Sequence, residues 1–555
     1  MEKIWLKNYP VGVPAEIDPD RYGSINEMME QACEQYRDKA AFSNMGTTIS
    51  YQVLEEQSRA FATYLLEVLK LQKGDRVAIM MPNLLQYPIA MFGILRAGLV
   101  VVNVNPLYTP RELEYELKDA LCEAVVILSN VAHTLQAILH AVNIRHIIVT
   151  EIGDLLKPPK SYCVNWIVKY IKRMIPPWSF PHYTTFRDAL KTGKTQPLNK
   201  PLVTGQDIAF LQYTGGTTGI AKGAILSHRN LVSNLQQAMA WVRPVMKPGQ
   251  EIIVTALPLY HIFSLTANCF TFVCLGALNI LVTNPRDLKS FVKLLSRHRF
   301  TAITGVNTLF KALLNHPDFS RIDFSPLRLT LGGGMAVQQT VAVRWESVTK
   351  TPLIEAYGLT ESSPAVCINP LNGRHFSGTI GLPISSTEIS IRTDDGEELG
   401  CEQPGELWVK GPQVMQGYWN RAEETALVLQ DGWLRTGDIA TIDETGFVRI
   451  IDRKKDMILV SGFNVYPNEV EEVISRMKGV LEVAVVGVPL EDGERVKAFI
   501  VKRDPTLTKE EILDQCHREL TAYKIPKEIE FRNELPKSAV GKILRRCLKE
   551  EKLKA

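Results

Sequence analysis

Residues Tyr213–Gly223 read Tyr-Thr-Gly-Gly-Thr-Thr-Gly-Ile-Ala-Lys-Gly, and they carry the strongest local signal in the chain. The segment packs four glycines, three threonines and one lysine into eleven residues. Glycine lets backbone N–H groups turn toward an anion without a Cβ in the way, and the hydroxyls and the ammonium add further donors. The composition predicts a loop that wraps a polyphosphate, and the simpler alternative is a solvated turn between two strands.

The P-loop motif, G-x-x-x-x-G-K-[ST], is the obvious competing interpretation. It does not fit, because Lys222 stands between an alanine and a glycine and no Gly-Lys-Ser/Thr step exists there. The pair Gly541-Lys542 continues with an isoleucine and fails the same test. The segment is therefore a nucleotide-phosphate loop of another kind.

The composition is that of a globular protein with more than one domain. The chain has 555 residues, 45% of them apolar and 22% charged, and its formal net charge is +3. That length predicts at least two domains, and that charge gives no reason to expect a nucleic-acid partner. The nine cysteines are dispersed without a Cys-x-x-Cys pair, which indicates reduced thiols in the cytoplasm and no zinc site. Residues 1–10 lack an apolar signal core.

The pattern of apolar runs predicts an α/β fold in several parts. Strand-like runs alternate with helical segments in residues 54–149, and a second cycle runs from residue 208 past residue 331, which predicts stacked α/β subdomains. Short strands with Gly turns follow in 378–451, and a small α+β unit comes after residue 456. The expected domains are 1–452 and 456–555, joined at 453–455. The uncharged segment 262–282 is long enough to span a membrane, but its asparagines and its turn into a strand-like run favour buried core.

One segment, 164–178, has an unusual pattern. Apolar residues recur at helical spacing from Val164 to Ile175, while Lys169, Lys172 and Arg173 occupy the opposite side and tryptophan and tyrosine flank it. A basic, aromatic-edged amphipathic helix can lie on an anionic bilayer. The alternative is a surface helix packed on its own domain.

Seven motifs in order make the chain resemble the adenylate-forming superfamily of acyl-CoA synthetases, from about residue 25 to residue 550. Within that superfamily it is most similar to bacterial long-chain fatty-acid–CoA ligases. The motifs are Tyr213 to Gly223, Leu257 to His261, Gly332 to Gly334, Tyr357 to Glu361, Thr436 to Asp438, Asp452 to Asp456 and Pro536 to Lys542. The resemblance implies a large N-terminal domain of stacked α/β subdomains with a small β subdomain, followed by a small mobile α+β domain.

The resemblance implies that ATP, Mg²⁺ and coenzyme A bind to particular residues. Tyr357 would stack on adenine, Asp438 would accept hydrogen bonds from the ribose with help from Arg453, and Thr360 would touch the α-phosphate. Thr217 and Glu361 would bind Mg²⁺ or its waters. The remaining nucleotide-loop and glycine positions are Tyr213, Thr214, Gly215, Gly216, Thr218, Gly219, Lys222, Gly333, Gly334 and Gly358.

The resemblance also implies how the two half-reactions are catalysed. Lys542 would reach from the small domain to the α-phosphate and the substrate carboxylate, and Arg545 and Arg546 would serve structure or the CoA phosphates. The small domain would then rotate about Lys455, and Gly462, Phe463 and Asn464 would line the pantetheine tunnel. His261 matches a position near the acyl carboxylate, with a satisfied core histidine as the alternative. The expected partners are a fatty acid and CoA, with no nucleic acid, whereas contact of 164–178 with an anionic membrane and a homodimer are left open.

Two departures from the usual motif and two rival functions have to be kept in view. Gly215-Gly216 replaces the usual Ser-Gly of the loop, and Ala221 replaces its proline, which leaves three threonine hydroxyls to cover the phosphates. The substrate could instead be a medium-chain or aryl acid, or the acceptor another thiol. A rival of a different class is a membrane-bound lipid-binding or scaffold protein, against which the intact Lys542, Glu361 and Asp438 argue.

Overall fold

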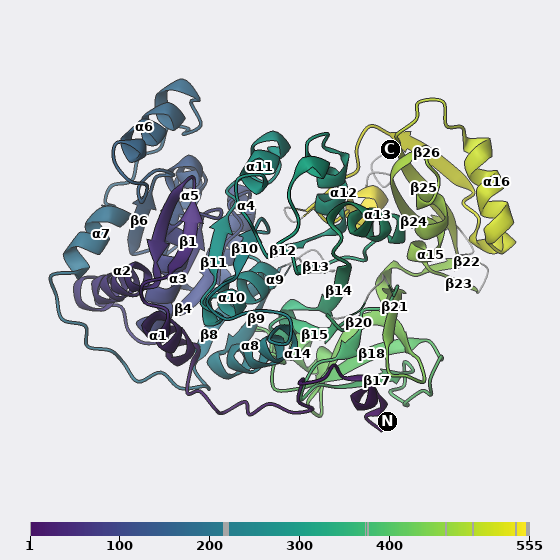
Figure 1. The fold of residues 1–555 in the computed structure, drawn as a ribbon, viewed down its shortest axis with the longest axis horizontal. Coiled ribbons are helices and arrows are strands. Elements are labelled where there is room, and N and C mark those ends of the chain that lie inside the picture. The colour runs from purple at the N-terminus through teal and green to yellow at the C-terminus, as the bar shows by residue number, and fades with distance from the viewer. Residues whose placement is uncertain are drawn as a thin grey trace.

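The computed structural model describes residues 2–214, 221–371, 373, 377–460, 463–490, 493–538 and 541–550. These residues form a large N-terminal domain with three sheets and a small C-terminal domain, which lies at the right of Figure 1. This arrangement confirms the predicted α/β fold class with an α+β domain at the end of the chain.

The first sheet has seven strands and is parallel except for its last pair. Its central strands are almost continuous apolar runs, as expected where helices cover both faces. The order across the sheet is β7 (Thr184–Thr185), β6 (His146–Thr150), β5 (Cys122–Leu128), β3 (Arg76–Met80), β4 (Val100–Asn103), β8 (Ile208–Thr214) and β9 (Lys222–Ser227).

The second sheet has nine strands, parallel at its centre and antiparallel at both edges. The N-terminal hairpin joins this sheet, because Phe42 of β1 pairs in parallel with Asn279 of β11. The order is β16 (Leu382–Pro383), β15 (Ala365–Ile368), β14 (Leu353–Gly358), β13 (Leu329–Gly332), β12 (Ala302–Gly305), β10 (Ile252–Thr255), β11 (Leu278–Leu281), β1 (Ala40–Asn44) and β2 (Thr47–Ser50).

Helix α3 (Gln86–Arg96) lies between the two sheets, and every one of its residues is buried. A helix that is apolar around its whole circumference needs such a two-sided environment. One core cluster joins α3 to Val77 of the first sheet and Ile253 of the second. The other helices of this domain are α1 (Ile25–Gln35), α2 (Tyr51–Thr63), α4 (Pro110–Asp119), α5 (Ala132–Ile138), α6 (Lys160–Trp166), α7 (Phe186–Gly193), α8 (His228–Val242), α9 (Ile262–Ser264), α10 (Thr271–Cys274), α11 (Leu288–Leu295), α12 (Asn307–Asn315), α13 (Gln339–Thr349) and α14 (Ala422–Val428).

The β subdomain predicted for 378–451 is a five-stranded sheet. It consists of β17 (Glu388–Arg392), β18 (Gly405–Lys410), β19 (Leu429–Gln430), β20 (Trp433–Ile442) and β21 (Val448–Arg453). The small domain has its own core around α15 and β24, and the predicted capping box at Thr508 opens α16. Its elements are β22 (Ile458–Val460), β23 (Phe463–Val465), α15 (Pro467–Ser475), β24 (Val480–Leu490), β25 (Gly493–Lys502), α16 (Lys509–Glu519), β26 (Glu528–Arg532) and α17 (Arg545–Glu550).

Two sequence predictions concerned segments that could meet a membrane. The segment 262–282 forms α9, a π-helical turn, α10 and the buried strand β11, which confirms that it is core. Within the described ranges no helix is long and apolar enough to cross a membrane. The helix predicted for Val164–Ile175 is shorter than expected, since α6 and the turn after it end at Ile171 and Arg173 has a left-handed φ of +48°.

Candidate active site

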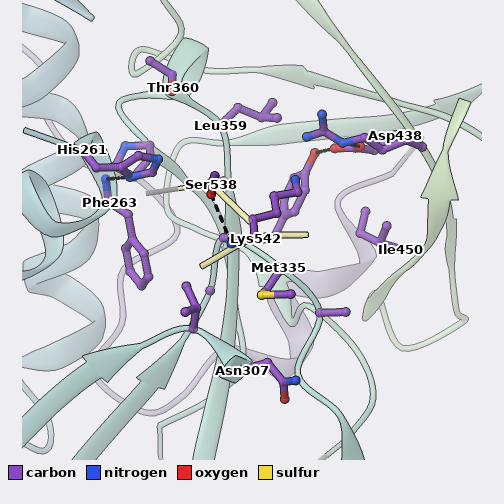
Figure 2. Close-up of a pocket in the computed structure, with 18 of the residues that line it drawn as sticks. His261, Phe263, Asn307, Met335, Leu359, Thr360, Asp438, Ile450, Ser538 and Lys542 are labelled. Atoms are coloured by element: carbon purple, nitrogen blue, oxygen red, sulfur yellow. Dashed lines mark hydrogen bonds and ion pairs between the residues drawn. The ribbon is translucent and has the colours of Figure 1, made fainter. Parts of the chain in front are cut away.

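A cavity of about 2240 Å³ lies where the large domain meets the small domain. The residues after β13 and at the end of β14 line one wall, and the segment around Lys542 lines another. Ligands of open α/β sheets bind outside the carboxyl ends of the strands, which makes this cavity the candidate active site. Figure 2 shows Lys542 reaching between His261 on one side and Asp438 on the other.

One end of the cavity is formed by Tyr357, Asp438 and Arg453. The hydroxyl of Tyr357, near the end of β14, donates to Oδ2 of Asp438 at 2.5 Å, and Nε of Arg453 lies 3.2 Å from Oδ1. Asp438 and Arg453 are directly opposite each other on β20 and β21. Burial and the neighbouring Asp438 raise the pKa of Tyr357 well above its usual value, so its hydroxyl remains a donor. The carboxylate is therefore held in a fixed orientation, and only 3% of Asp438 is exposed.

The predicted phosphate loop connects the antiparallel strands β8 and β9, whose last and first residues, Thr214 and Lys222, are register partners. Gly215, Gly216, Thr217, Thr218 and Gly219 lie outside the described residues. Thr214 and Lys222 line the cavity. Tyr213 lines it as well, but its hydroxyl donates to Asp119 Oδ2 of α4 at 2.7 Å. This hydroxyl therefore points to α4 and does not donate to a phosphate.

Glu361 and Lys222 are connected through a residue that sequence reasoning missed, Tyr418. Its hydroxyl donates to Glu361 Oε1 at 2.7 Å, and the Lys222 ammonium lies 5.1 Å above its ring. An aromatic ring under a cation adds a modest attraction. The only sequence signal was an aromatic residue after Gly417, which no motif singled out. Tyr418 therefore holds Glu361, the predicted metal-binding carboxylate, close to the loop lysine Lys222.

Lys542 reaches the cavity from a turn that is docked on the large domain. Its amide donates to Ser538 Oγ at 3.1 Å, and Thr308 of α12 donates to the carbonyl of Gly541 at 3.3 Å. Gly541 has φ +84°, and a Cβ there would lie 2.7 Å from Thr308 Oγ1. Glycine is required at this position for both reasons. We call this placement of the small domain the Lys542-in arrangement.

The surroundings of Lys542 reduce the basicity of its amine. Burial, and next the cationic Arg453, lower the pKa of Lys542 to about 8, while Asp438 opposes this effect. The amine therefore carries its proton at neutral pH but loses it under mildly alkaline conditions. An anion that enters between these groups would be attracted by both cations.

His261 is a neutral imidazole at the N-terminus of α9. Its Nδ1 accepts from the amide of Phe263 at 3.3 Å. Burial, and to a lesser extent Lys542, lower the pKa of His261 to about 4. Because Nδ1 is an acceptor, the ring proton is on Nε2, and the residue can donate one hydrogen bond without adding a positive charge.

The predicted glycine-rich and threonine positions surround the middle of the cavity. Gly333, Gly334, Gly358 and Thr360 all line it. Gly334 is exposed and has φ +75°, and a Cβ on the buried Gly333 would lie 3.0 Å from the carbonyl of Ala356, so the backbone conformation of Gly334 and the close packing at Gly333 both favour glycine here.

The residues predicted for the second half-reaction divide into two groups. Lys455 lines the cavity, and burial lowers its pKa. Phe463 and Asn464 are absent from the cavity lining; they lie on β23 at the outer end of the small domain (Figure 1). Phe463 is 57% exposed and stacks on Tyr523 with ring centres 4.8 Å apart. Gly462 lies outside the described residues.

A large cavity between two domains, with an oriented carboxylate, a glycine- and threonine-rich hairpin connection and a lysine supplied by the second domain, is typical of nucleotide-dependent ligases. Comparison with known proteins agrees. Residues 29–419 match the family model described as AMP-binding enzyme, and residues 469–542 match the AMP-binding enzyme C-terminal domain. The chain belongs to the AMP-binding enzyme family.

Individual relatives extend over the whole chain. The Yersinia pestis protein named long-chain-fatty-acid–CoA ligase is 60% identical over 100% of this chain and 99% of its own length. The Escherichia coli O6:H1 protein of the same name is 57% identical over 99% of this chain and 98% of its own. The crystal structure of the anthranilate CoA ligase AuaEII in complex with anthranoyl-AMP superimposes with a TM-score of 0.84 at 24% identity, covering 98% of each chain.

Proposed function

We infer that this protein is an ATP-dependent long-chain fatty-acid–CoA ligase. It converts a fatty acid to an acyl-adenylate with release of pyrophosphate, and it then transfers the acyl group to coenzyme A, with AMP as the second product. The relatives at 57–60% identity support the overall reaction. The observation that carries the chemistry is the approach of the Lys542 ammonium to Asp438 and Arg453 across the domain interface.

The nucleotide is proposed to bind at the end of the cavity that contains Tyr357 and Asp438. The carboxylate of Asp438 accepts hydrogen bonds only, which suits the two ribose hydroxyls, and Arg453 holds its orientation. The ring of Tyr357 offers a face for adenine while its hydroxyl stays bound to Asp438. Gly334, which is exposed in the cavity lining and has no Cβ, allows the base to approach the backbone closely.

The phosphates are proposed to lie toward the β8–β9 hairpin, with Thr214 to Lys222 around them and Thr360 near the α-phosphate. The described residues hold no group of three or more His, Cys, Asp and Glu side chains that could bind a metal by themselves. A lone carboxylate such as Glu361 nevertheless fits Mg²⁺, which takes most of its ligands from water and substrate phosphates. Glu361, with Thr217, would hold the ion, and the ion would neutralise phosphate charge.

Adenylation needs positioning and charge stabilisation and no protein nucleophile. The fatty-acid carboxylate attacks the α-phosphorus, the bond to the bridging oxygen of pyrophosphate breaks, and pyrophosphate leaves with that electron pair. The protonated amine of Lys542 stabilises the negative charge on the five-coordinate phosphorus and on the carboxylate. His261 would hold the acyl carboxylate by a hydrogen bond from Nε2 without adding a competing charge.

The acyl chain is proposed to lie along the apolar part of the cavity. Ala238, Trp241 and Val242 lie on one face of α8 and line it together with Phe272 of α10. Burial of each methylene group in such surroundings contributes about 0.8 kcal/mol, which favours long chains over short ones as far as the cavity extends.

Thioester formation is proposed to require rotation of residues 456–555 against 1–452 about the hinge 453–455. In the Lys542-in arrangement Lys542 occupies the space that the CoA thiol would need, whereas Phe463 and Asn464 face away from the cavity. A Lys455→Pro substitution, which restricts the hinge, should spare adenylation and slow thioester formation. Equal loss of both half-reactions would contradict the hinge.

The fatty acid is proposed to reach the enzyme at an anionic membrane surface, through residues 164–178. Ile171 and Met174 of the predicted apolar face and the flanking Trp166 and Tyr170 are between 50% and 62% exposed. Val168 of the same face is buried, so part of the face packs on its own domain and part does not. The exposed cations Lys169, Lys172 and Arg173 lie in the same segment and complement anionic lipid headgroups.

Vesicle sedimentation tests the membrane contact. Vesicles with phosphatidylglycerol should bind the protein, and a Lys169→Glu, Lys172→Glu, Arg173→Glu variant should lose this binding. The matched control changes three exposed lysines of the small domain, Lys478, Lys509 and Lys527, to glutamate and should keep it. Binding that survives the first triple change would rule out this surface.

The decisive test of the function is pyrophosphate release from ATP and Mg²⁺ with acetate, palmitate, oleate and benzoates, with and without CoA. We expect CoA-dependent turnover that is highest with palmitate and oleate. Turnover only with short or aryl acids would keep the mechanism and overturn the substrate. Absence of turnover with every acid would favour a lipid-binding or scaffold protein.

A further inference from the structure

The buried side chain of Arg545 gathers three carboxylates from different parts of the chain. Its guanidinium donates to both carboxylate oxygens of Glu471, at 3.1 and 2.8 Å, and to Asn468 Oδ1 at 2.6 Å. It also donates to Asp452 Oδ1 at 3.3 Å and Asp456 Oδ2 at 3.4 Å. Only 17% of the Arg545 side chain is exposed, and the Asp452 side chain is fully enclosed. Charges so deeply buried are costly unless every partner stays in place.

Asp452 has a second contact with the small domain, at the start of α15. Tyr466, the N-cap residue of this helix, makes no side-chain cap, and Pro467 has no N–H group. The first free amide, that of Asn468, donates to Asp452 Oδ2 at 2.7 Å, and the Asn468 side chain returns a hydrogen bond to the carbonyl of Ile451 at 3.1 Å. A carboxylate at a helix N-terminus satisfies an unpaired amide and interacts favourably with the helix dipole. The helix α15 is therefore capped from outside its own domain.

These contacts fall on two sides of the proposed hinge at 453–455. Asp452 is the penultimate residue of β21 and directly precedes the hinge. The strand β21 is part of the five-stranded sheet and runs toward α15 (Figure 1). Asn468, Glu471 and Arg545 all belong to the small domain and would move together. A rotation about Lys455 would keep the Arg545–Glu471 pair and would break both contacts of Asp452.

Arg545 is also the first residue of α17, three positions after Lys542. The position of α17 relative to β21 therefore fixes where the Lys542 turn meets the large domain. We propose that Asp452 and Arg545 are positioning residues that hold the small domain in the Lys542-in arrangement. This inference rests on the proposed role of Lys542 in adenylation and on the proposed rotation. It adds that the contacts of Asp452 with Asn468 and Arg545 favour the Lys542-in arrangement over the rotated one.

The proposal predicts that the two half-reactions respond differently to the same substitution. Loss of one hydrogen bond to a charged group shifts a conformational equilibrium by roughly 10- to 100-fold. The Asp452 Oδ1 atom also accepts from the Arg453 amide at 2.8 Å. The Asp452→Asn variant keeps an oxygen for this amide but lacks the charge, and Arg545→Gln lacks the opposite charge. Both should slow palmitate-dependent ATP–pyrophosphate exchange by a factor in that range. Neither should slow thioester formation from supplied palmitoyl-adenylate and CoA.

Glu471→Gln provides a matched control, because it changes a carboxylate of the same Arg545 cluster that stays on the same side of the hinge. It should affect both half-reactions equally. The double variant Asp452→Asn with Arg545→Gln should be no slower in exchange than the worse single variant, since the two charges act as a pair. Thermal unfolding of each full-length protein reports whether it is folded. Arg545→Lys, which keeps the charge but not the fork of donors, replaces Arg545→Gln if that variant is unfolded, and it should again slow exchange without slowing thioester formation.

The rates of the two half-reactions in these variants and in Lys542→Ala would decide between the proposals. Equal slowing of both half-reactions by Asp452→Asn and Arg545→Gln would overturn the positioning role, and so would no effect on exchange in folded protein. Lys542→Ala serves as the reference: if it leaves exchange unchanged, the proposed role of Lys542 is wrong and the positioning role falls with it. If Lys542→Ala abolishes exchange while the Asp452 and Arg545 variants exchange normally, only the positioning role fails.

Discussion

Substitution of Gly541 by alanine should slow adenylation, because two separate strains act on the turn that carries Lys542. The backbone of Gly541 is in the left-handed region, with φ +84°, where an alanine costs about 1–2 kcal/mol. The added Cβ would also lie 2.7 Å from Thr308 Oγ1, closer than such contacts allow. Thr308 cannot rotate away freely, since it is β-branched and its hydroxyl donates to the Gly541 carbonyl.

The backbone strain alone sets the minimum effect. At 1.36 kcal/mol for each factor of ten, a cost of about 1–2 kcal/mol lowers the population of the turn conformation that presents Lys542 by about 5- to 30-fold. We expect the rate of palmitate-dependent ATP–pyrophosphate exchange to fall by that factor or more. Thioester formation from palmitoyl-adenylate should fall less, because the contact with Thr308 would be absent after rotation.

Two further variants separate the causes. Gly396→Ala introduces the same kind of backbone strain, at φ +88° with nothing within 4 Å, in a hairpin of the β subdomain, and it should leave exchange unchanged. Adding Thr308→Ala to Gly541→Ala removes the close contact but not the strain, so it should restore part of the rate. Exchange by Gly541→Ala within twofold of the parent protein would refute the argument that this turn has to dock on α12.

Three other predictions concern single groups of the site. The kcat/KM for ATP should fall as the pH rises through about 8, because the lowered pKa of Lys542 leaves the amine charged below that pH and neutral above it. Lys542→Arg should abolish this fall in kcat/KM. A fall that persists in that variant would show that Lys542 is not the titrating group. Asp438→Asn, which weakens the pair with Arg453, should lower kcat/KM for ATP by about 10- to 100-fold and narrow the preference for ATP over 2′-deoxy-ATP, and an unchanged preference would argue against ribose binding. Tyr418→Phe removes the hydrogen bond to Glu361 but keeps the ring, so adenylation should require a several-fold higher Mg²⁺ concentration, measured by titration. An unchanged Mg²⁺ requirement would show that Tyr418 does not influence metal binding.

Sequence reasoning predicted the parts of the fold that depend on local patterns. The buried strand β11 was expected from an apolar run after a turn, and the capping box of α16 was expected from Thr508 and Glu511. These features are determined by residues a few positions apart. The helix end at Ile171 was missed, because a single left-handed residue, Arg173, stops an otherwise regular apolar pattern.

The contacts that complete the site could not be read from the sequence. Tyr418 and Glu361 are 57 residues apart, and Arg545 and Asp452 are 93 residues apart. A tyrosine or an arginine has many acceptors in a chain of this length, and no periodic pattern selects one of them. The motifs predicted residues for ligand contacts, and these stay predictions, whereas Tyr418 and the Arg545–Asp452 pair became visible only through their contacts.

The membership of β1 in the nine-stranded sheet has a consequence for how the protein is made. Asn44 at the end of β1 bonds to the carbonyl of Leu281, 237 residues later in the chain. At the usual rate of synthesis, about 5–20 residues per second, the N-terminal hairpin waits roughly 10–50 s for its parallel partner to be translated. During that time β1 and β2 form at most an isolated hairpin with an open edge, which is marginally stable and prone to pair with other chains. The nine-stranded sheet therefore cannot incorporate β1 until β11 has been translated, and the N-terminal hairpin stays without its parallel partner for that time.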